Sequence, residues 1–145
     1  MRAVVTRVSS ASVEISNQVT GSIDKGFLVL LGIKKGDTEE DAIKLANKVC
    51  TLRIFEDQNG KMNLDLGAVG GSLLIISQFT LYANTKSRRP GFTDAAAPQE
   101  AIPLYELFIE TCKKAGFPVQ TGTFGAMMTI KSVNEGPVTI IINNE

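Results

Sequence analysis

The chain has 145 residues, which suits one domain with its own buried core. Its apolar fraction of 43% is ordinary for a globular protein, and no apolar run reaches the ~18 residues of a membrane helix. Fifteen basic and fifteen acidic residues leave no net charge, which argues against a protein that covers nucleic acid through many phosphates.

Histidine is absent from the sequence. Its absence excludes Ser-His-Asp and Cys-His catalysis and zinc sites with histidine ligands. Any hydrolysis must therefore draw on another source of activation. We expect a cytoplasmic protein, because Arg2 and Arg7 stand where a secretory signal would be apolar. Cys50 and Cys112 are then expected to be reduced and to fill the core as small apolar side chains.

The N-terminal residues predict strands. In residues 2–9 and 11–15, successive side chains alternate between two faces as they do in a strand. Asn17-Gln18 lies where a hairpin would turn. Residues 27–32 form a continuous apolar run, which is typical of a strand buried on both faces.

A helix is predicted over residues 37–50, with Asp37 or Thr38 as its cap and acidic residues in its first turn. The apolar residues at helical spacing are Ile43, Leu45, Ala46 and Val49. A second helix is predicted over residues 98–114, with Gly116 as its stop. The polar segment before it, residues 84–98, is predicted to be an exposed loop.

The remaining segments have strand character. These strands are expected at residues 52–55, 73–77, 119–122, 127–133 and 138–142. Strands and helices do not alternate regularly along the chain, so the sequence predicts an α+β fold. We expect residues 1–145 to form a single compact domain, a mainly antiparallel, barrel-like β-sheet with two helices.

Two segments carry more polar groups than a scaffold needs. Ser77-Gln78-Phe79-Thr80-Leu81 directly follows an apolar strand, and its side chains must be satisfied internally or open into a site. By residue type alone, a strand that reaches the surface explains them as well. The second segment is Asn134-Glu135-Gly136-Pro137-Val138-Thr139, which local chemistry favours as an ordinary turn between strands.

Together and in this order, the two segments resemble the two signature motifs of the D-aminoacyl-tRNA deacylase family. The resemblance runs nearly end to end. It includes residues 7–13, 53–55, 60–63, 91–92 and 121–124.

The resemblance implies an enzyme that hydrolyses the ester joining a D-amino acid, or glycine, to the terminal ribose of tRNA. It implies a homodimer that needs no metal and no organic cofactor. Thr80 matches the family's proposed catalytic threonine, acting either as a nucleophile or as a group that orients the ester. Ser77, Gln78 and Phe79 would bind the substrate, and Phe124 would line the pocket, although a plain core aromatic explains Phe124 equally well.

Gly136-Pro137 matches a Gly-cis-Pro element that enters the active site of the other subunit and leaves no room for an L side chain. By the same resemblance, Arg7 is expected to hold this loop in place. Taken alone, Arg7 is also explained as a surface cation on a strand. The motif is completed by Asn134, Val138 and Thr139.

Two other functions stay open. One is a nucleic-acid-binding protein that assists replication, and the other is a hydrolase of free small metabolites. The neutral net charge and the aromatic content of 6% argue against the first. For contact with an RNA end, one basic cluster is Lys86, Arg88 and Arg89, and the other is Lys113 with Lys114. Solvated surface charge also explains both clusters.

Overall fold

One long strand, β1, is the centre of the sheet in the computed structural model, which describes residues 1–144. β8 lies along one edge of β1, and β2 and β3 follow one another along the other edge, all three antiparallel to it. In chain order the elements are β1 (Arg2–Ile15), β2 (Gln18–Ile23), β3 (Gly26–Gly32), α1 (Glu39–Thr51), β4 (Phe55–Glu56), β5 (Met62–Leu64), β6 (Ser72–Ser77), the 3-10 helix η1 (Phe79–Tyr82), α2 (Pro98–Lys114), β7 (Val119–Thr121) and β8 (Thr129–Asn143).

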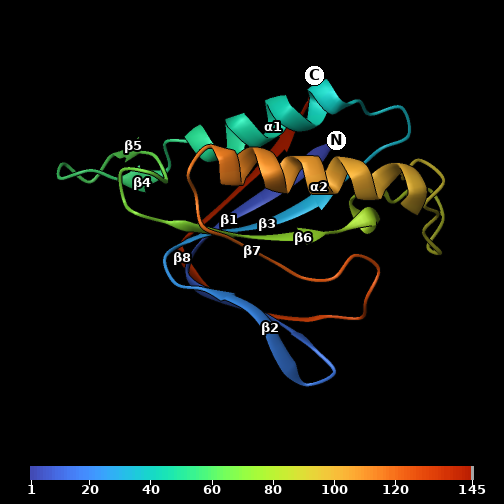
Figure 1. Ribbon diagram of the computed structural model, residues 1–145, viewed down its shortest axis with the longest axis horizontal. Coiled ribbons are helices and arrows are strands. Elements are labelled where there is room, and N and C mark those ends of the chain that lie inside the picture. The colour runs from blue at the N-terminus through green and yellow to red at the C-terminus, as the bar shows by residue number, and fades with distance from the viewer. Residues whose placement is uncertain (145) are drawn as a thin grey trace.

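The sheet continues from β3 through β6 to β7, and both of these pairings are parallel. α1 lies in the connection from β3 to β6, and α2 lies in the connection from β6 to β7. Because such crossovers are right-handed, both helices cover the same face of the sheet, as Figure 1 shows. Neither α1 nor α2 is long and apolar enough to cross a membrane, within the residues described.

The sheet curls until it almost closes. β2 returns against β7, where a methyl group added to Gly21 would lie 3.0 Å from the carbonyl oxygen of Thr121. One hydrophobic cluster packs between the helices and the sheet, with Phe27 and Phe108 fully buried in it. A second, smaller cluster fills the inside of the curl. The α+β, barrel-like sheet with two helices that the sequence predicts is therefore confirmed.

Three of the predicted strand boundaries are wrong. Residues 2–9 and 11–15 form the single strand β1, and the turn after it is centred on Ser16 and Asn17, both with positive φ. The strand expected at 52–55 is only Phe55–Glu56, paired with β5. Residues 127–133 and 138–142 belong to one strand, β8, which begins at Thr129.

Both predicted helices are present. Thr38 caps α1 in a capping box with Asp41, and Leu45, Ala46 and Val49 are buried as expected. Ile43 is instead exposed, because it lies on the outer side of the helix. Cys50 and Cys112 are free thiols buried in the core, as the sequence predicts.

Candidate active site

The carboxyl ends of the three parallel strands meet at one edge of the sheet. Gly32 ends β3, Ser77 ends β6 and Thr121 ends β7. Parallel sheets bind ligands at this edge, because the chain leaves every strand there and the loops can diverge around a crevice. The polar segment that follows β6 is therefore carried to the edge where a site is expected.

A pocket of about 290 Å³ opens at this edge. It is lined by two chain segments: residues 76–79, which leave β6, and residues 124–128, which lie between β7 and β8, together with Ile130 of β8. Ser77, Gln78, Phe79 and Phe124, all predicted as site residues, come together here. Phe124 also packs edge-on against Tyr105, with ring centroids 5.9 Å apart, so it serves both the core and the pocket.

Thr80 lies beside this pocket. Its exposed hydroxyl is held by the side-chain amide of Gln78, which donates a hydrogen bond to Oγ1. Thr80 and Phe79 open the 3-10 helix η1, so within residues 1–144 their backbone N–H groups have no backbone acceptor. One hydroxyl and two amide groups are therefore available to a bound molecule.

The pocket lining contains no ionisable side chain. Tyr82, at the end of η1, lies three residues beyond Phe79, but burial, assisted by the charge of Asp37, raises its pKa to about 12. Its phenol is therefore protonated at neutral pH. Over the described part of the chain, no three His, Cys, Asp or Glu side chains gather as metal ligands would. The site can position and polarise a substrate, but it has no base of its own.

Two contacts that the sequence did not reveal hold η1 in place. Arg2 donates a hydrogen bond of 2.8 Å from Nη1 to the carbonyl oxygen of Leu81, and its guanidinium lies 4.9 Å from the ring centroid of Tyr82. Gly32 allows the close approach from the other side, because a Cβ at this residue would lie 2.9 Å from the Cβ of Leu81. No local pattern could have indicated Arg2, since it lies 79 residues from Leu81.

Asn134, Gly136 and Pro137 lie elsewhere. Here β8 has four residues, 135–138, opposite Arg7 alone of β1, so the segment bulges out of the sheet. Thr139 resumes the pairing opposite Thr6, and Val138 is buried in the core. The predicted turn between two strands is therefore a bulge within one strand.

The Gly136–Pro137 peptide bond is cis, and residues 134–137 are exposed. Arg7 lies beneath them with only 5% of its surface exposed, which is unusual for a charged side chain. Its guanidinium donates to the carbonyl oxygens of Ile54 at 2.7 Å and of Glu135 at 3.2 Å. Arg7 thus ties the bulge to the segment before β4 and is not a surface cation.

The bulge and the pocket are far apart in the same chain. Figure 1 shows the bend of β8 toward the left end of the sheet and the short helix that follows β6 at the right end. The hollow beside Gly136, lined by Arg7, Lys25, Phe55, Glu56 and Glu135, shares no residue with the pocket at Ser77. A single subunit therefore does not bring the two motifs together.

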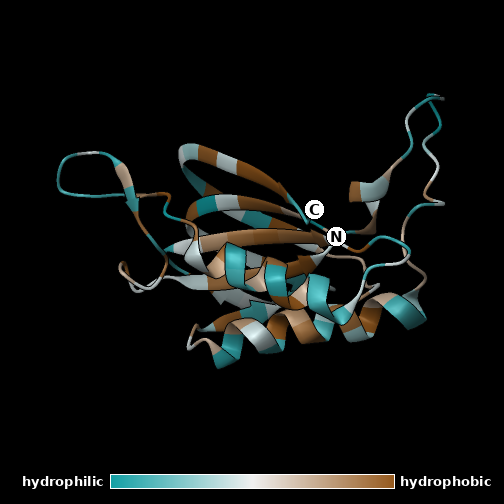
Figure 2. Ribbon diagram, turned by 90° about the horizontal axis from the view of Figure 1, so that it is seen from above, coloured by the Kyte–Doolittle hydropathy of each residue, from teal (hydrophilic) through white to brown (hydrophobic). Residues whose placement is uncertain are grey.

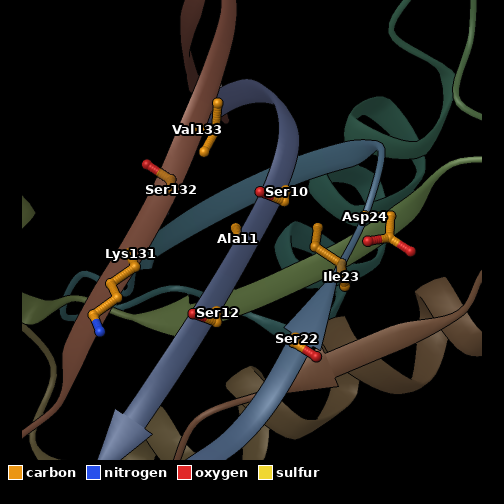
Figure 3. Close-up of a pocket in the computed structure, with 9 residues that line it drawn as sticks. All are labelled: Ser10, Ala11, Ser12, Ser22, Ile23, Asp24, Lys131, Ser132 and Val133. Atoms are coloured by element: carbon orange, nitrogen blue, oxygen red, sulfur yellow. The ribbon is translucent and has the colours of Figure 1, made fainter.

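A further hollow of about 270 Å³ lies across β2, β1 and β8 (Figure 3). Its lining includes Ser10, Ser12 and Ser22, together with Lys131, which is paired with Glu14 at 3.1 Å. It shares no residue with the pocket at Ser77. None of the predicted site residues lines it.

The fold is thus a curled sheet with two helices on one face and a pocket at the carboxyl ends of its parallel strands, where Ser77 and Gln78 are the polar side chains of the lining. The family model described as D-Tyr-tRNA(Tyr) deacylase matches residues 4–143, and the chain belongs to this family.

Similar proteins extend over nearly the whole chain. The D-aminoacyl-tRNA deacylase of Thermus aquaticus is 52% identical over 99% of this chain and 95% of its own length. The D-aminoacyl-tRNA deacylase of Aquifex aeolicus is 52% identical over 99% of this chain and 98% of its own length. Among solved structures, one titled c-Myc DNA Unwinding Element Binding Protein superposes with a TM-score of 0.95 at 36% identity, covering 100% of this chain and 99% of that one.

Arg2 offers a direct test of how η1 is held. Arg2→Ala removes its hydrogen bond to Leu81 and its contact with Tyr82, so we expect the amides of Leu81 and Ala83 to exchange with solvent about tenfold faster. Hydrogen exchange followed by mass spectrometry or NMR measures this. Lys44→Ala, which removes only the exposed ion pair with Glu40, is the control and should leave both rates unchanged. Unchanged rates in Arg2→Ala would mean that packing at Gly32 alone holds the helix.

Proposed function

We propose that this chain hydrolyses the ester bond of D-aminoacyl-tRNA, and of glycine carried by a non-cognate tRNA, and releases the amino acid and the tRNA. Membership of the family supports the reaction, and the relatives named above carry this activity in their names. The observation that carries the proposal is the pocket at Ser77 and Gln78, where a few hydroxyl and amide groups stand in a largely apolar lining that has no ionisable side chain.

Such a pocket suits an ester that is already reactive. Water attacks the ester carbonyl, the carbonyl oxygen becomes an oxyanion, and the bond to the ribose oxygen then breaks as that oxygen takes up a proton. The neighbouring ribose hydroxyl lies beside the reacting carbonyl and helps to position or deprotonate the water. The protein contributes placement of the ester and hydrogen bonds to the oxyanion.

Thr80 acts in this proposal as a hydrogen-bonding group and not as a nucleophile. A threonine hydroxyl needs a base before it attacks, and the pocket lining offers none. Gln78 holds Oγ1 by donating to it, which leaves the hydroxyl proton free to point at the substrate. Together with the amides of Phe79 and Thr80, it orients the ester, while Ser77 and Phe79 hold the terminal adenosine.

The Gly136-Pro137 element serves the active site of a second copy of the chain. It is exposed and lies away from the pocket of its own subunit, so it meets such a pocket only in a dimer. β8, which carries it, pairs only with β1 among the residues described, and its other edge is open along fifteen residues. An open edge of this length is a surface on which another chain pairs.

This element accounts for chiral selection. A rigid backbone segment placed against the substrate's α-carbon leaves no room for an L side chain, accepts a D side chain that points the other way, and admits glycine. Arg7 supplies the rigidity, because it binds the carbonyl of Glu135 and contacts Gly136. The carbonyl oxygens of the element are then free to accept hydrogen bonds from the substrate's α-amino group.

Binding to DNA is the second candidate, because one structural neighbour at 36% identity is titled as a DNA unwinding element binding protein. The absence of net charge argues against extensive contact with duplex DNA. A hydrolase of free metabolites is the third candidate.

Three substrates separate these functions. We expect rapid release of amino acid from D-Tyr-tRNA and Gly-tRNA, with L-Tyr-tRNA hydrolysed more slowly by on the order of a hundredfold. Release of labelled amino acid from each charged tRNA measures this. A DNA-binding protein would release none, and a hydrolase of free metabolites would not spare the L ester.

The role of Thr80 is tested by Thr80→Ala, with Thr80→Ser as the control that keeps the hydroxyl. Loss of one hydrogen bond to the ester should lower kcat about tenfold. Loss of a nucleophile would lower it by roughly 10⁴-fold or more. Acid quenching followed by mass spectrometry should find no amino acid bound to Thr80, and a trapped acyl-threonine would refute the positioning role.

The shared active site is tested by mixing two variants. Gly136→Ala places a Cβ 2.9 Å from Nη2 of Arg7, so it displaces the element and should admit L-Tyr-tRNA. Reassociation with an equal amount of Gln78→Ala/Thr80→Ala chains, whose own pockets are slowed about tenfold or more, puts about half of the Gly136→Ala chains into mixed dimers. Their working pockets then face an intact element, so L-Tyr-tRNA hydrolysis per Gly136→Ala chain should fall by about half. An unchanged rate would mean that the element acts on its own subunit.

A further inference from the structure

Residues 84–91, which we call the basic finger, stand away from the body of the protein beside η1. Asn84 and Gly91 close its base with two backbone hydrogen bonds, of 2.7 and 2.9 Å. Figure 2 shows it as the hydrophilic loop at the upper right, extended away from the sheet and helices. All eight residues are exposed.

Three cations and no anion lie in the finger. They are Lys86, Arg88 and Arg89, and none of them forms an ion pair within residues 1–144. A local charge of plus three in a chain with no net charge means that the rest of the molecule is acidic by the same amount. Unpaired cations on an extended loop remain free to bind anions outside the protein.

The base of the finger is fixed to the candidate active site. Phe92 follows Gly91 directly and packs edge-on against Phe79, with ring centroids 5.2 Å apart. Phe79 lines the pocket and is 54% exposed. At its other end, the finger begins at Asn84, two residues after Tyr82, where η1 ends. A molecule that enters the pocket and continues outward on this side therefore passes the finger.

The segment that follows the finger, residues 92–95, lies beside two lysines of the connection between β3 and α1. The amide of Lys35 donates to the carbonyl oxygen of Asp94 at 3.0 Å, and Lys34 bridges to Ala95, so both exposed lysines lie beside this segment. These contacts also limit movement of the segment, since they tie it to the connection between β3 and α1. The finger is thus anchored to the body, while the carboxylates of Asp37 and Asp94 offset the charge of the two lysines.

We propose that the basic finger binds the phosphates of the single-stranded 3′ end of tRNA, and so holds the aminoacyl end in the pocket. This rests on the proposed function, because it takes the substrate to be an ester at an RNA terminus. The nucleotides before the terminal adenosine each carry one phosphate, and an extended cationic loop at the pocket matches a chain of such charges. The contact is to the backbone, so it serves all tRNAs alike.

The test is the triple variant Lys86→Gln/Arg88→Gln/Arg89→Gln. The turns of the finger are made by the backbone amides of Lys86 and Arg89, bound to Asn84 and Ser87, so they survive the change of side chains. The control is Lys48→Gln/Lys113→Gln/Lys114→Gln, which removes the same charge from α1 and from the C-terminal end of α2. In Figure 1 that end of α2 lies opposite the finger.

We expect the finger variant to raise KM for D-Tyr-tRNA by roughly tenfold to a hundredfold at 0.1 M salt, with kcat unchanged. Each phosphate contact on a single strand contributes ~0.7 to the slope of log KM against log salt. Loss of three contacts should therefore lower this slope by about two. The D-tyrosyl ester of adenosine, which has no phosphate, should be hydrolysed as by the wild type. The control variant should leave KM and kcat unchanged for both substrates.

Each outcome decides the proposal. An unchanged KM and salt slope for D-Tyr-tRNA, or an equal loss with the adenosine ester, would overturn the role of the finger. An equal effect of the control variant would also overturn it, since general charge would then explain the binding. Fluorescence titration with uncharged tRNA separates this from the proposed function. If the wild type binds that tRNA through the finger but cleaves neither ester, the deacylase proposal fails and the finger proposal stands.

Discussion

The parallel pairing of β3 with β6 is the constraint on which the site depends. It brings the carboxyl ends of the two strands to one edge, and the pairing of β6 with β7 adds a third. β3 and β6 approach most closely at Gly26, where a Cβ would lie 1.8 Å from the carbonyl oxygen of Ser72 and no side chain fits. At the other end of β3, Gly32 admits η1 against the strand. The two glycines thus set where β6 begins and where the segment after it lies.

The pocket compensates for its lack of ionisable groups by rigidity. Hydroxyl and amide groups accelerate a reaction only when they are already aimed at the place where charge develops. Here, packing at Gly32, the hydrogen bond from Arg2 and the β6 backbone all hold the first turn after the strand. The ring of Tyr82, in contact with the guanidinium of Arg2, contributes to this packing. The contacts that end strand β6 therefore also hold the hydroxyl and amide groups beside the pocket in place.

Arg7 performs the corresponding task for the Gly136-Pro137 bulge. A buried guanidinium requires partners for its donors, and here backbone carbonyls supply two of them. Glu56 adds a weak interaction from 3.9 Å, with its carboxylate mostly in solvent. The cation therefore links β1, the segment before β4 and the bulge of β8. An exposed backbone segment held from beneath in this way presents a fixed shape to a neighbouring molecule.

The sequence by itself determined the elements whose periodicity is local: both helices, the apolar strand β3, the strand β6 and the exposed loop before α2. Its two polar motifs also located the residues around Ser77 and the cis-proline bulge. Only the tertiary structure decided that β6 runs parallel to its neighbours, that Arg2 reaches η1, and that the bulge lies away from the pocket of its own chain. Local pattern records how one segment buries its own side chains, whereas pairing, register and the approach of distant residues arise from packing among all of them. For the same reason, the long edge of β8 and the isolated basic finger could be recognised only after the chain was folded.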